Sequence, residues 1–289
     1  MKRIISILLL LFLVFLAACT DGEEEDKEII SSPKDQEETH EDDQAQQSTE
    51  EDDKERSETE SAEPVDKIQE EPKYEIAEDW SITPINGQAN EQVVLLTIDD
   101  APDDYAVEMA NTLKELDVNA IFFVNGHFLN TPEDEEKLRE IHEMGFVIGN
   151  HTYSHPNLRE ISEEEQTEEI ISLSDRVEEI IGERPLFFRA PHGANTDHSN
   201  QIVKNEGMAV MNWTYGYDYF EPYMDAEKLT TAMITGEGPE VDVPYSLLKP
   251  GANLLMHDRE WTAAALEDIV TGLQDKGYEI VDPNLIRTN

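Results

Sequence analysis

The sequence has few cysteines and few basic residues for its length. Cys19 is the one cysteine among 289 residues, so an intramolecular disulfide and a zinc site built from several cysteines are both excluded. Lys and Arg number 21 against 66 Asp and Glu, which gives a formal net charge of −45. Because nucleic acid binding needs a basic surface, we expect no nucleic acid partner. No HExxH pattern occurs, which argues against a metalloprotease.

A long apolar run occurs once, from Ile4 to Ala18, and only Ser6 interrupts it. The run follows two basic residues and is short for a bilayer span, which is typical of a secretory signal. It ends in Leu-Ala-Ala-Cys19, which resembles the lipobox of bacterial lipoproteins. That resemblance implies that residues 1–19 hold a lipoprotein signal, with lipidation at Cys19 and anchoring at the outer face of the cell membrane. A plain signal peptide and an uncleaved anchor are the alternatives.

Aromatic residues are missing from residues 21–71, where 23 acidic side chains accompany 5 basic ones. Such a segment cannot bury enough apolar surface to offset its chain entropy, and its charges repel one another. We therefore expect residues 20–73 to form a disordered acidic linker. It would hold the folded part of the chain away from the membrane, within the cell wall.

Residues 74–289 contain enough sequence for one domain with a sizeable core. Apolar runs of strand length alternate with segments of helical period. The expected strands are 93–98, 120–124, 146–148, 186–188, 208–212, 253–256 and 278–281, and the expected helices are 104–116, 133–144, 162–181, 200–205, 226–233 and 262–275. This alternation predicts an α/β fold with a parallel sheet, either open and doubly wound or closed as a barrel.

Candidate metal ligands follow two of these strands. His151 and His155, in the sequence HTYSH, follow the third strand, and Asp99 and Asp100 follow the first. Catalytic zinc usually takes three protein ligands, so two histidines need a carboxylate to complete the set. The other carboxylate could then take a proton from the attacking water. HxxxH alone and a DD pair alone are common in ordinary helices and turns; their occurrence together at two strand ends favours a metal site.

Two further strands end in groups suited to the same chemistry. Arg189 follows the fourth strand and would hold Asp99 ionised and oriented, while His257 ends the sixth and could protonate a leaving group. Asp218 or Asp258 would sustain the positive charge on His257. Each residue has an ordinary alternative, as a structural ion pair or as a hydrogen-bonded histidine at the end of a strand.

The ordered motifs TIDD, HTYSH, RAPHG and LLMH resemble those of the polysaccharide deacetylases, the NodB-like carbohydrate esterases of family 4, and the resemblance covers about residues 93–280. It implies a deformed (β/α)7 barrel that removes acetyl groups from sugars with the help of a metal ion. The roles it implies are base for Asp99, metal ligands for Asp100, His151 and His155, acid for His257, orientation of the base for Arg189, wall of the acetate pocket for Leu254, and an oxyanion-binding main-chain N–H at His192.

Two motifs depart from the family pattern. Ala101 stands where the family usually has glycine after the two aspartates. In the fourth motif, usually DxxDW, Asp218 and Tyr219 fit the end, but Tyr215 occupies the position of the first aspartate. These departures bear on the sugar preference. The segment from Gly236 to Tyr245, rich in Pro and acidic residues, is expected to line the substrate groove as an inserted loop.

The resemblance implies a divalent cation, for which we expect zinc, with cobalt, nickel and manganese as alternatives. An anchor at the outer surface favours peptidoglycan, through its N-acetylglucosamine or N-acetylmuramic acid, as the substrate. Xylan and chitin, and O-acetyl in place of N-acetyl groups, stay open. We expect a monomer. The alternative function is a wall-binding lipoprotein that keeps the sugar groove and has lost turnover.

Overall fold

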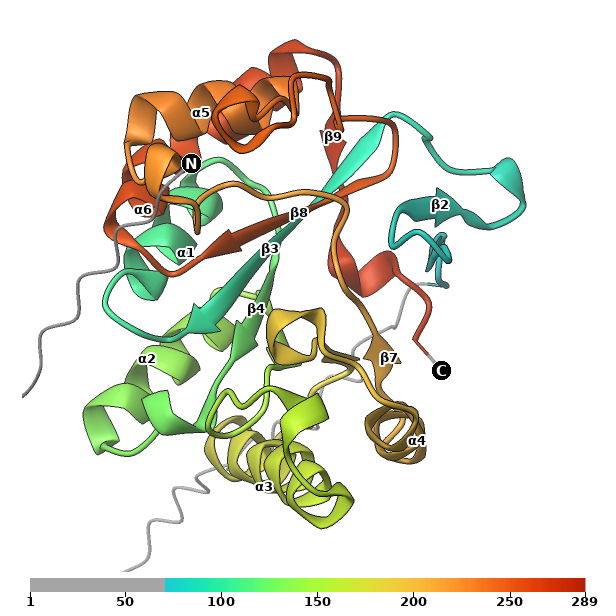
Figure 1. The fold of residues 1–289 in the computed structure, drawn as a ribbon, viewed down its shortest axis with the longest axis vertical. Helices are drawn as coiled ribbons and strands as arrows, with labels where there is room; N and C mark the ends of the chain where they lie inside the picture. Colours follow the sequence, from blue (N-terminus) through green and yellow to red (C-terminus); the bar gives the residue numbers. More distant parts are fainter. Residues whose placement is uncertain (1–70, 289) are drawn as a thin grey trace, which may run out of the picture. The chain divides into compact units, whose positions relative to one another are not determined.

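The computed structural model describes residues 71–288, which form a parallel sheet of seven strands with helices around it (Figure 1). The predictions for Cys19 and for nearly all of the acidic linker lie outside these residues. The strands are β3 (Val93–Ala101), β4 (Ile121–Val124), β5 (Val147–Asn150), β6 (Phe187–Phe188), β7 (Ala209–Val210), β8 (Ala252–His257) and β9 (Glu279–Ile280). Their order is β7-β6-β5-β4-β3-β8, and β9 also pairs with β3. All seven predicted strands are confirmed.

The sheet curls into a barrel that closes irregularly. The last strand, β9, pairs with Val93 and Val94 at the start of β3 and does not extend the sheet beyond β8. Between β7 and β8, an irregular segment takes the place of a strand: Tyr215 forms an isolated parallel bridge with Leu254, and Thr214 N donates to Asn253 O at 2.9 Å. The fold is therefore a deformed (β/α)7 barrel, as the resemblance to the polysaccharide deacetylases implied; the alternation of strands and helices alone had left an open sheet possible.

Within residues 71–288, six α-helices alternate with the strands. They are α1 (Ala106–Glu115), α2 (Pro132–Glu143), α3 (Glu163–Ile181), α4 (Asp197–Asn205), α5 (Ala226–Thr235) and α6 (Glu260–Asp275). Capping boxes on Thr131 and Ser162 begin α2 and α3, and Gly182, with φ of 79°, ends α3. The helix α4 begins three residues before its predicted start, because Thr196 caps it by accepting a hydrogen bond from Ser199 N. Among residues 71–288, no helix combines the length and apolarity needed to cross a membrane.

A small antiparallel pair, β1 (Tyr74–Ile76) with β2 (Ile82–Pro84), lies outside the main sheet and was not predicted. Each of its strands has only three residues, which is too short to show a period of two. Lys73 N donates to Leu285 O at 2.8 Å, so the start of the described chain is tied to its end.

Alternate residues of β3 face opposite sides of the sheet, and this alternation positions the site. Leu96 and Ile98 pack in the core cluster between strands and helices, whereas Leu95 packs in a second cluster with Phe123 and Phe187 inside the barrel. Because side chains alternate along a strand, the buried residues Thr97 and Asp99 share the face of Leu95. The side of β3 that faces the inside of the barrel therefore changes from apolar at its amino end to polar at its carboxyl end.

Candidate active site

A cavity of about 530 Å³ opens at the carboxyl ends of the strands; we call it the carboxyl-end pocket. Eight of the predicted site residues line it: Asp99, Asp100, His151, His155, His192, Asp218, Tyr219 and His257. Arg189 is fully buried behind Asp99 and is not among the lining residues. The sequence argument that strand ends bring these groups together is confirmed.

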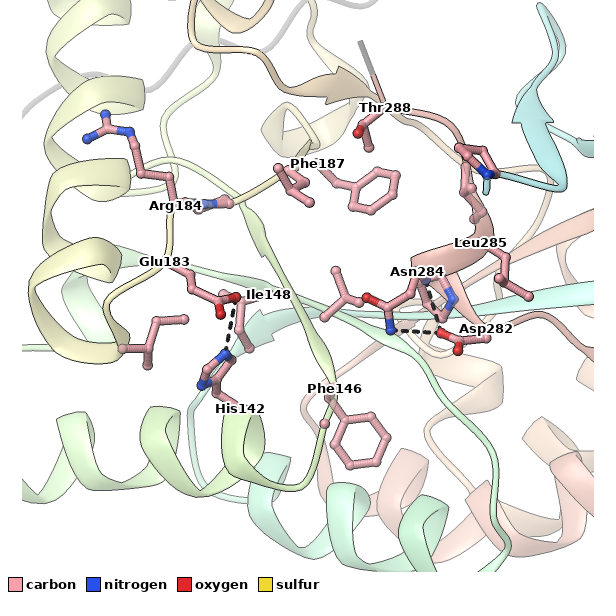
Figure 2. A pocket seen from close by; sticks show the side chains of 18 residues that line it. His142, Phe146, Ile148, Glu183, Arg184, Phe187, Asp282, Asn284, Leu285 and Thr288 are labelled. Carbon is pink, nitrogen blue, oxygen red and sulfur yellow. Dashed lines mark hydrogen bonds and ion pairs between the residues drawn. The ribbon is translucent and has the colours of Figure 1, made fainter. Parts of the chain in front are cut away.

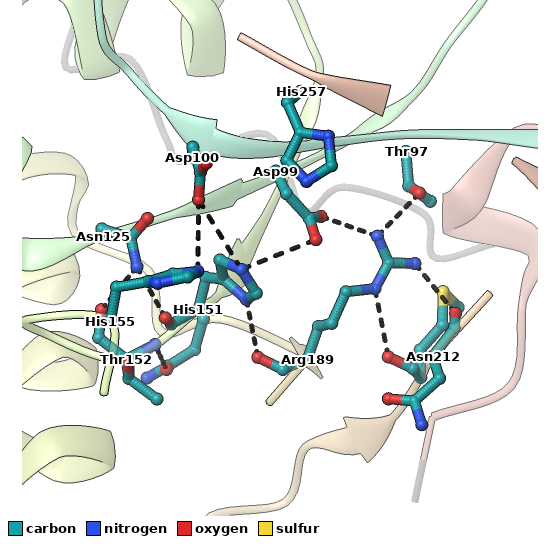
Figure 3. Close-up of polar contacts among 12 residues, drawn as sticks. Thr97, Asp99, Asp100, Asn125, His151, Thr152, His155, Arg189, Asn212 and His257 are labelled. Carbon is teal, nitrogen blue, oxygen red and sulfur yellow. Dashed lines mark hydrogen bonds and ion pairs between the residues drawn. The ribbon is translucent and has the colours of Figure 1, made fainter. Parts of the chain in front are cut away.

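The predicted ligand set is the one group of three potential metal ligands found in residues 71–288. Asp100 Oδ1 lies 3.4 Å from His155 Nε2 and 3.8 Å from His151 Nε2, and the ligand atoms of the three residues all lie within 4.8 Å of one another (Figure 3). A carboxylate with two imidazoles is a donor set typical of zinc and of other transition metals. The three residues therefore fit the divalent cation that the motifs imply.

Both histidines are in the neutral form that metal binding requires, and a hydrogen bond fixes the tautomer of His151. His151 Nδ1 lies 2.8 Å from the carbonyl oxygen of Arg189, which can only accept, so Nδ1 carries the hydrogen and the lone pair of Nε2 faces the cation position. Burial lowers the pKa of His151 to about 3 and also lowers that of His155. Both rings are consequently neutral at physiological pH, the form that binds metal.

The backbone that carries these ligands curls through left-handed conformations. Asp100, Thr152 and His155 have φ of 61°, 68° and 61°. Residues other than glycine rarely adopt such angles, and each costs of the order of 1–3 kcal/mol unless its surroundings enforce it. Here Asn125 Nδ2 enforces the turn by donating to His151 O at 2.6 Å and to Thr152 O at 3.1 Å. The tertiary structure thus supplies the curl that two histidines four residues apart need to converge.

Asp99 is positioned by a buried arginine. Arg189 Nη1 donates to Asp99 Oδ1 at 2.6 Å and to Thr97 Oγ1 at 2.8 Å, and Nη2 donates to Asn212 O at 2.9 Å. The predicted orienting contact is present. The expectation that Arg189 holds Asp99 ionised is not met by the protein groups, because burial raises the pKa of this carboxyl group and the guanidinium only opposes that effect. In the protein without a cation, burial is the larger of the two influences.

His257 lies directly across from Asp99, since the two residues are register partners on β8 and β3. Its Nδ1 lies 2.8 Å from Asp218 Oδ1, and Thr262 Oγ1 donates to Asp218 Oδ2 at 2.9 Å. Burial alone would lower the pKa of His257, but the carboxylates of Asp218, Asp99 and Asp100, with Asp218 first among them, together outweigh burial and raise it to about 9. His257 is therefore protonated at neutral pH, as a general acid must be.

Of the two carboxylates considered as partners of His257, the structure selects Asp218. Asp258 instead accepts hydrogen bonds from the backbone N–H groups of Asp103, at 2.6 Å, and Tyr105, at 2.7 Å. It therefore ties the loop after β3 to the loop after β8. Burial raises the pKa of Asp258 to about 6.

The two departures from the family motifs are accommodated. Ala101 belongs to β3, is fully buried and is not among the residues with positive φ, so the position does not require glycine. Tyr215, in the place of an aspartate, is buried in the core, and its hydroxyl donates to Met233 O at 2.7 Å. Tyr219 is 43% exposed and its ring centre lies 5.7 Å from that of His257.

The prediction that Leu254 forms the pocket wall is wrong. Leu254 pairs in register with Leu96 and packs with it in the core between sheet and helices. Because side chains alternate along β8, Leu255 shares the face of His257, and it is Leu255 that lines the pocket. Counting two residues back from His257 would have identified it.

No residue from Gly236 to Tyr245, the predicted groove loop, lines the carboxyl-end pocket itself, so its place along a substrate groove stays a prediction. This segment packs elsewhere: the hydroxyl of Tyr217 donates to Gly236 O at 2.7 Å, and Tyr223 is hydrogen-bonded to Glu240. The lining residues that the sequence argument missed are Trp213, Met224, Leu255, Arg259 and Trp261. Arg259, two residues after His257, was the one among them with a visible signal, a charged residue at a strand end.

A second cavity, of about 590 Å³, lies at the opposite end of the strands, and we call it the amino-end cavity (Figure 2). It is lined by apolar residues near the starts of β5 and β6, among them Phe146, Ile148 and Phe187. Two of its polar residues form a pair, His142 Nε2 with Glu183 at 3.5 Å, while Arg184 pairs with carboxylates outside the lining. This cavity contains no group of three potential metal ligands from the described residues.

Fold and site together define a deformed α/β barrel with an Asp-His-His triad that could hold a metal ion at its carboxyl-end edge. The family model for polysaccharide deacetylases matches residues 86–211. A peptidoglycan-N-acetylglucosamine deacetylase from Bacillus cereus is 30% identical over 218 residues, which cover 73% of this chain and 75% of that protein. The chain belongs to the polysaccharide deacetylase family.

Two solved structures show how far the likeness extends. One, a peptidoglycan N-acetylglucosamine deacetylase, is 27% identical with a TM-score of 0.59, over 69% of this chain and 90% of that one. The other is a family 4 pseudoenzyme from Bacillus anthracis, 26% identical with a TM-score of 0.57, over 66% of this chain and 63% of that one. The family therefore includes proteins described as active enzymes and a protein described as a pseudoenzyme.

Proposed function

We propose that this protein is a metal-dependent deacetylase that acts on N-acetylated sugars of a cell-wall polysaccharide, with peptidoglycan as the substrate. One observation carries the proposal. A candidate base, Asp99, and a protonated candidate acid, His257, are register partners on neighbouring strands, and both line the pocket that contains the Asp-His-His triad. Hydrolysis of an amide needs all three functions within one pocket.

Each group of candidate site residues has a distinct role in the proposed reaction. Asp100, His151 and His155 hold the cation, for which zinc is the proposed metal. When bound, the cation acts as a Lewis acid that polarises the acetyl carbonyl and favours ionisation of water. Asp99, oriented by Arg189, accepts the proton of the attacking water. The main-chain N–H of His192 donates to the developing oxyanion, and His257 gives its proton to the sugar nitrogen as acetate leaves.

The similarity to the peptidoglycan-N-acetylglucosamine deacetylase of Bacillus cereus supports peptidoglycan as the substrate. The lipobox-like sequence before Cys19 supports the location at the membrane. A protein anchored through Cys19 at the outer face of the membrane, as a monomer on an acidic linker, would reach the adjacent wall. Cys19→Ser should release the protein from membranes while the acetate release of its domain stays unchanged. Continued partitioning of that variant into detergent would contradict the anchor.

A second function is supported by the similarity to the Bacillus anthracis pseudoenzyme: a wall-binding protein without turnover. Ala101 and the altered fourth motif motivate it. The complete set of base, ligands and acid around one pocket argues against it.

The deciding experiment measures acetate and free amines by mass spectrometry after incubation with defined chitooligosaccharides, purified peptidoglycan and acetylated xylan. The proposal expects free amines from peptidoglycan with zinc-loaded protein, and release lower by about two to four powers of ten with Asp99→Asn as the matched control. Release from xylan alone would show an O-acetyl esterase instead. No release from any polymer with zinc, cobalt or manganese would favour the wall-binding protein.

A further inference from the structure

Arg259, at the loop between β8 and α6, contacts the carboxylate of a candidate metal ligand. Its Nη2 donates to Asp100 Oδ2 at 2.7 Å, while the other oxygen of that carboxylate, Oδ1, faces the Nε2 atoms of His151 and His155. Arg259 also lines the carboxyl-end pocket and is about one-third exposed, at 35%. The two oxygens of Asp100 therefore have different partners. Oδ2 is bound by the guanidinium of Arg259, and Oδ1 faces the place where the cation would bind.

A carboxylate can bind a cation through one oxygen or through both. The oxygen held by Arg259 is oriented toward the guanidinium, and the positive charge of that group opposes a cation nearby. We propose that Arg259 is a positioning residue that restricts Asp100 to ligation through a single oxygen. The restriction leaves room around the cation for water and the acetyl group, and it makes cation binding weaker than the triad alone would give.

A purely structural role for Arg259 is the competing explanation. Arg259 Nη1 donates to Asp258 O at 2.7 Å and lies 3.9 Å from Asp103 Oδ2, so it contacts both the loop after β8 and the loop after β3. These loops are already joined by the carboxylate of Asp258, which accepts from two backbone N–H groups of the β3 loop. The connection between the loops consequently does not depend on Arg259.

The test uses metal-free wild type, Arg259→Met, Arg259→Lys and a control, Arg139→Met. Arg139 is 36% exposed and paired with carboxylates of its own helix α2, so its loss removes the same charge away from the site. Zinc affinity is measured by competition with a chelating indicator, and coordination by the visible absorption of the Co²⁺-loaded protein. Thermal unfolding of each metal-free variant verifies that it is folded.

In Arg259→Met, both oxygens of Asp100 become available and a repelling charge is lost. We expect zinc to bind about 10-fold more tightly. Loss of a group around a metal ligand usually weakens binding on this scale, and here the removal of a repelling positive charge reverses the direction. The visible absorption of Co²⁺ should weaken, because a higher coordination number lowers its intensity. Arg259→Lys, which keeps a positive donor, and Arg139→Met should both resemble wild type. Weaker zinc binding by Arg259→Met, or an unchanged Co²⁺ spectrum or affinity, would overturn the assignment.

This inference rests on the proposed metal-dependent function, but the two can fail separately. Neither the zinc affinity nor the Co²⁺ spectrum requires a substrate. A wild-type protein that binds both metals and releases no acetate would refute the deacetylase and leave the role of Arg259 intact. Acetate release by wild type, combined with unchanged metal binding in Arg259→Met, would refute only the role of Arg259.

Discussion

The carboxyl-end pocket and the amino-end cavity have similar volumes, about 530 and 590 Å³, and very different linings. Three lining residues of the carboxyl-end pocket, Asp100, His155 and His192, have positive φ. None of the described non-glycine residues that line the amino-end cavity has a positive φ. Strained backbone conformations therefore occur in the pocket where the candidate metal ligands converge. The backbone conformation of the lining residues distinguishes the two cavities, whereas their volumes do not.

The same contrast runs along a single strand. Inward-facing positions of β3 are Val93 and Leu95 at the amino end, then Thr97 and Asp99 at the carboxyl end. The first pair contributes to the apolar interior, and the second receives hydrogen bonds from Arg189. One end of the barrel therefore stabilises the fold, and the other end holds polar groups that the fold must position. Four substitutions test this division of labour.

Asp99→Asn should have the largest effect on turnover. Asparagine keeps the size of the side chain and can still accept from Arg189, but it cannot take a proton from water. We expect acetate release to fall by about two to four powers of ten, the usual contribution of a positioned base. Zinc content, measured by elemental analysis, should stay near that of wild type, because the three ligands are untouched. Acetate release at the wild-type rate would rule out this base.

His155→Ala should weaken metal binding without destabilising the fold. Outer partners of ligands affect metal affinity by about 10- to 100-fold, so removal of a ligand should weaken zinc binding by at least about 100-fold. The side chain of His155 is 26% exposed and is not part of a core cluster, so the thermal unfolding of the metal-free protein should change little. Undiminished zinc in the purified variant would count against the site.

The sequence predicted the strands of the main sheet, the helices and most of the candidate site residues because each depends on a local pattern. Runs of apolar residues located the strands. The polar residues that follow these runs were then the candidates for the site: Asp99, Asp100, His151, His155, Arg189 and His257. The choice between Asp218 and Asp258 could not be made, because it depends on how an irregular segment returns to β8. Leu254 was chosen in place of Leu255 because the face of a strand was not counted from His257. The contact of Arg259 with Asp100 joins two residues 159 positions apart in the sequence, so no local pattern could predict it.

Asp218→Asn should move the pH dependence of turnover. The pKa of His257 is raised above its ordinary value of about 6.5, to about 9, so the acid stays protonated until the pH rises through about 9. The stabilisation that the His257–Asp218 pair gives the fold follows the same course: it is complete below about pH 6.5 and is lost as the pH rises through about 9. In Asp218→Asn, the alkaline limb should shift toward about 6.5.

Turnover measured across pH with one substrate would reveal that shift. An alkaline limb that stays at its wild-type position in Asp218→Asn would mean that another group sets the protonation of His257. Thr262→Val, which removes the other side-chain hydrogen bond to Asp218 and leaves both carboxylate and histidine, is the matched control and should move the limb less.

Phe187→Leu should have the smallest effect on turnover, because Phe187 lines the amino-end cavity and packs in the apolar interior but does not line the carboxyl-end pocket. Phe187 is 1% exposed and packs inside the barrel, so its replacement by a smaller apolar residue should cost about 1 kcal/mol of unfolding free energy. Denaturant unfolding would measure this loss, and the rate of acetate release per folded molecule should stay within about twofold of wild type. Phe187 and Arg189 lie two residues apart on one chain segment, so a large loss of turnover would show that packing at the amino end controls the position of Arg189. In that case the two ends of the barrel would be coupled, and the division between a stabilising end and a chemical end would be wrong.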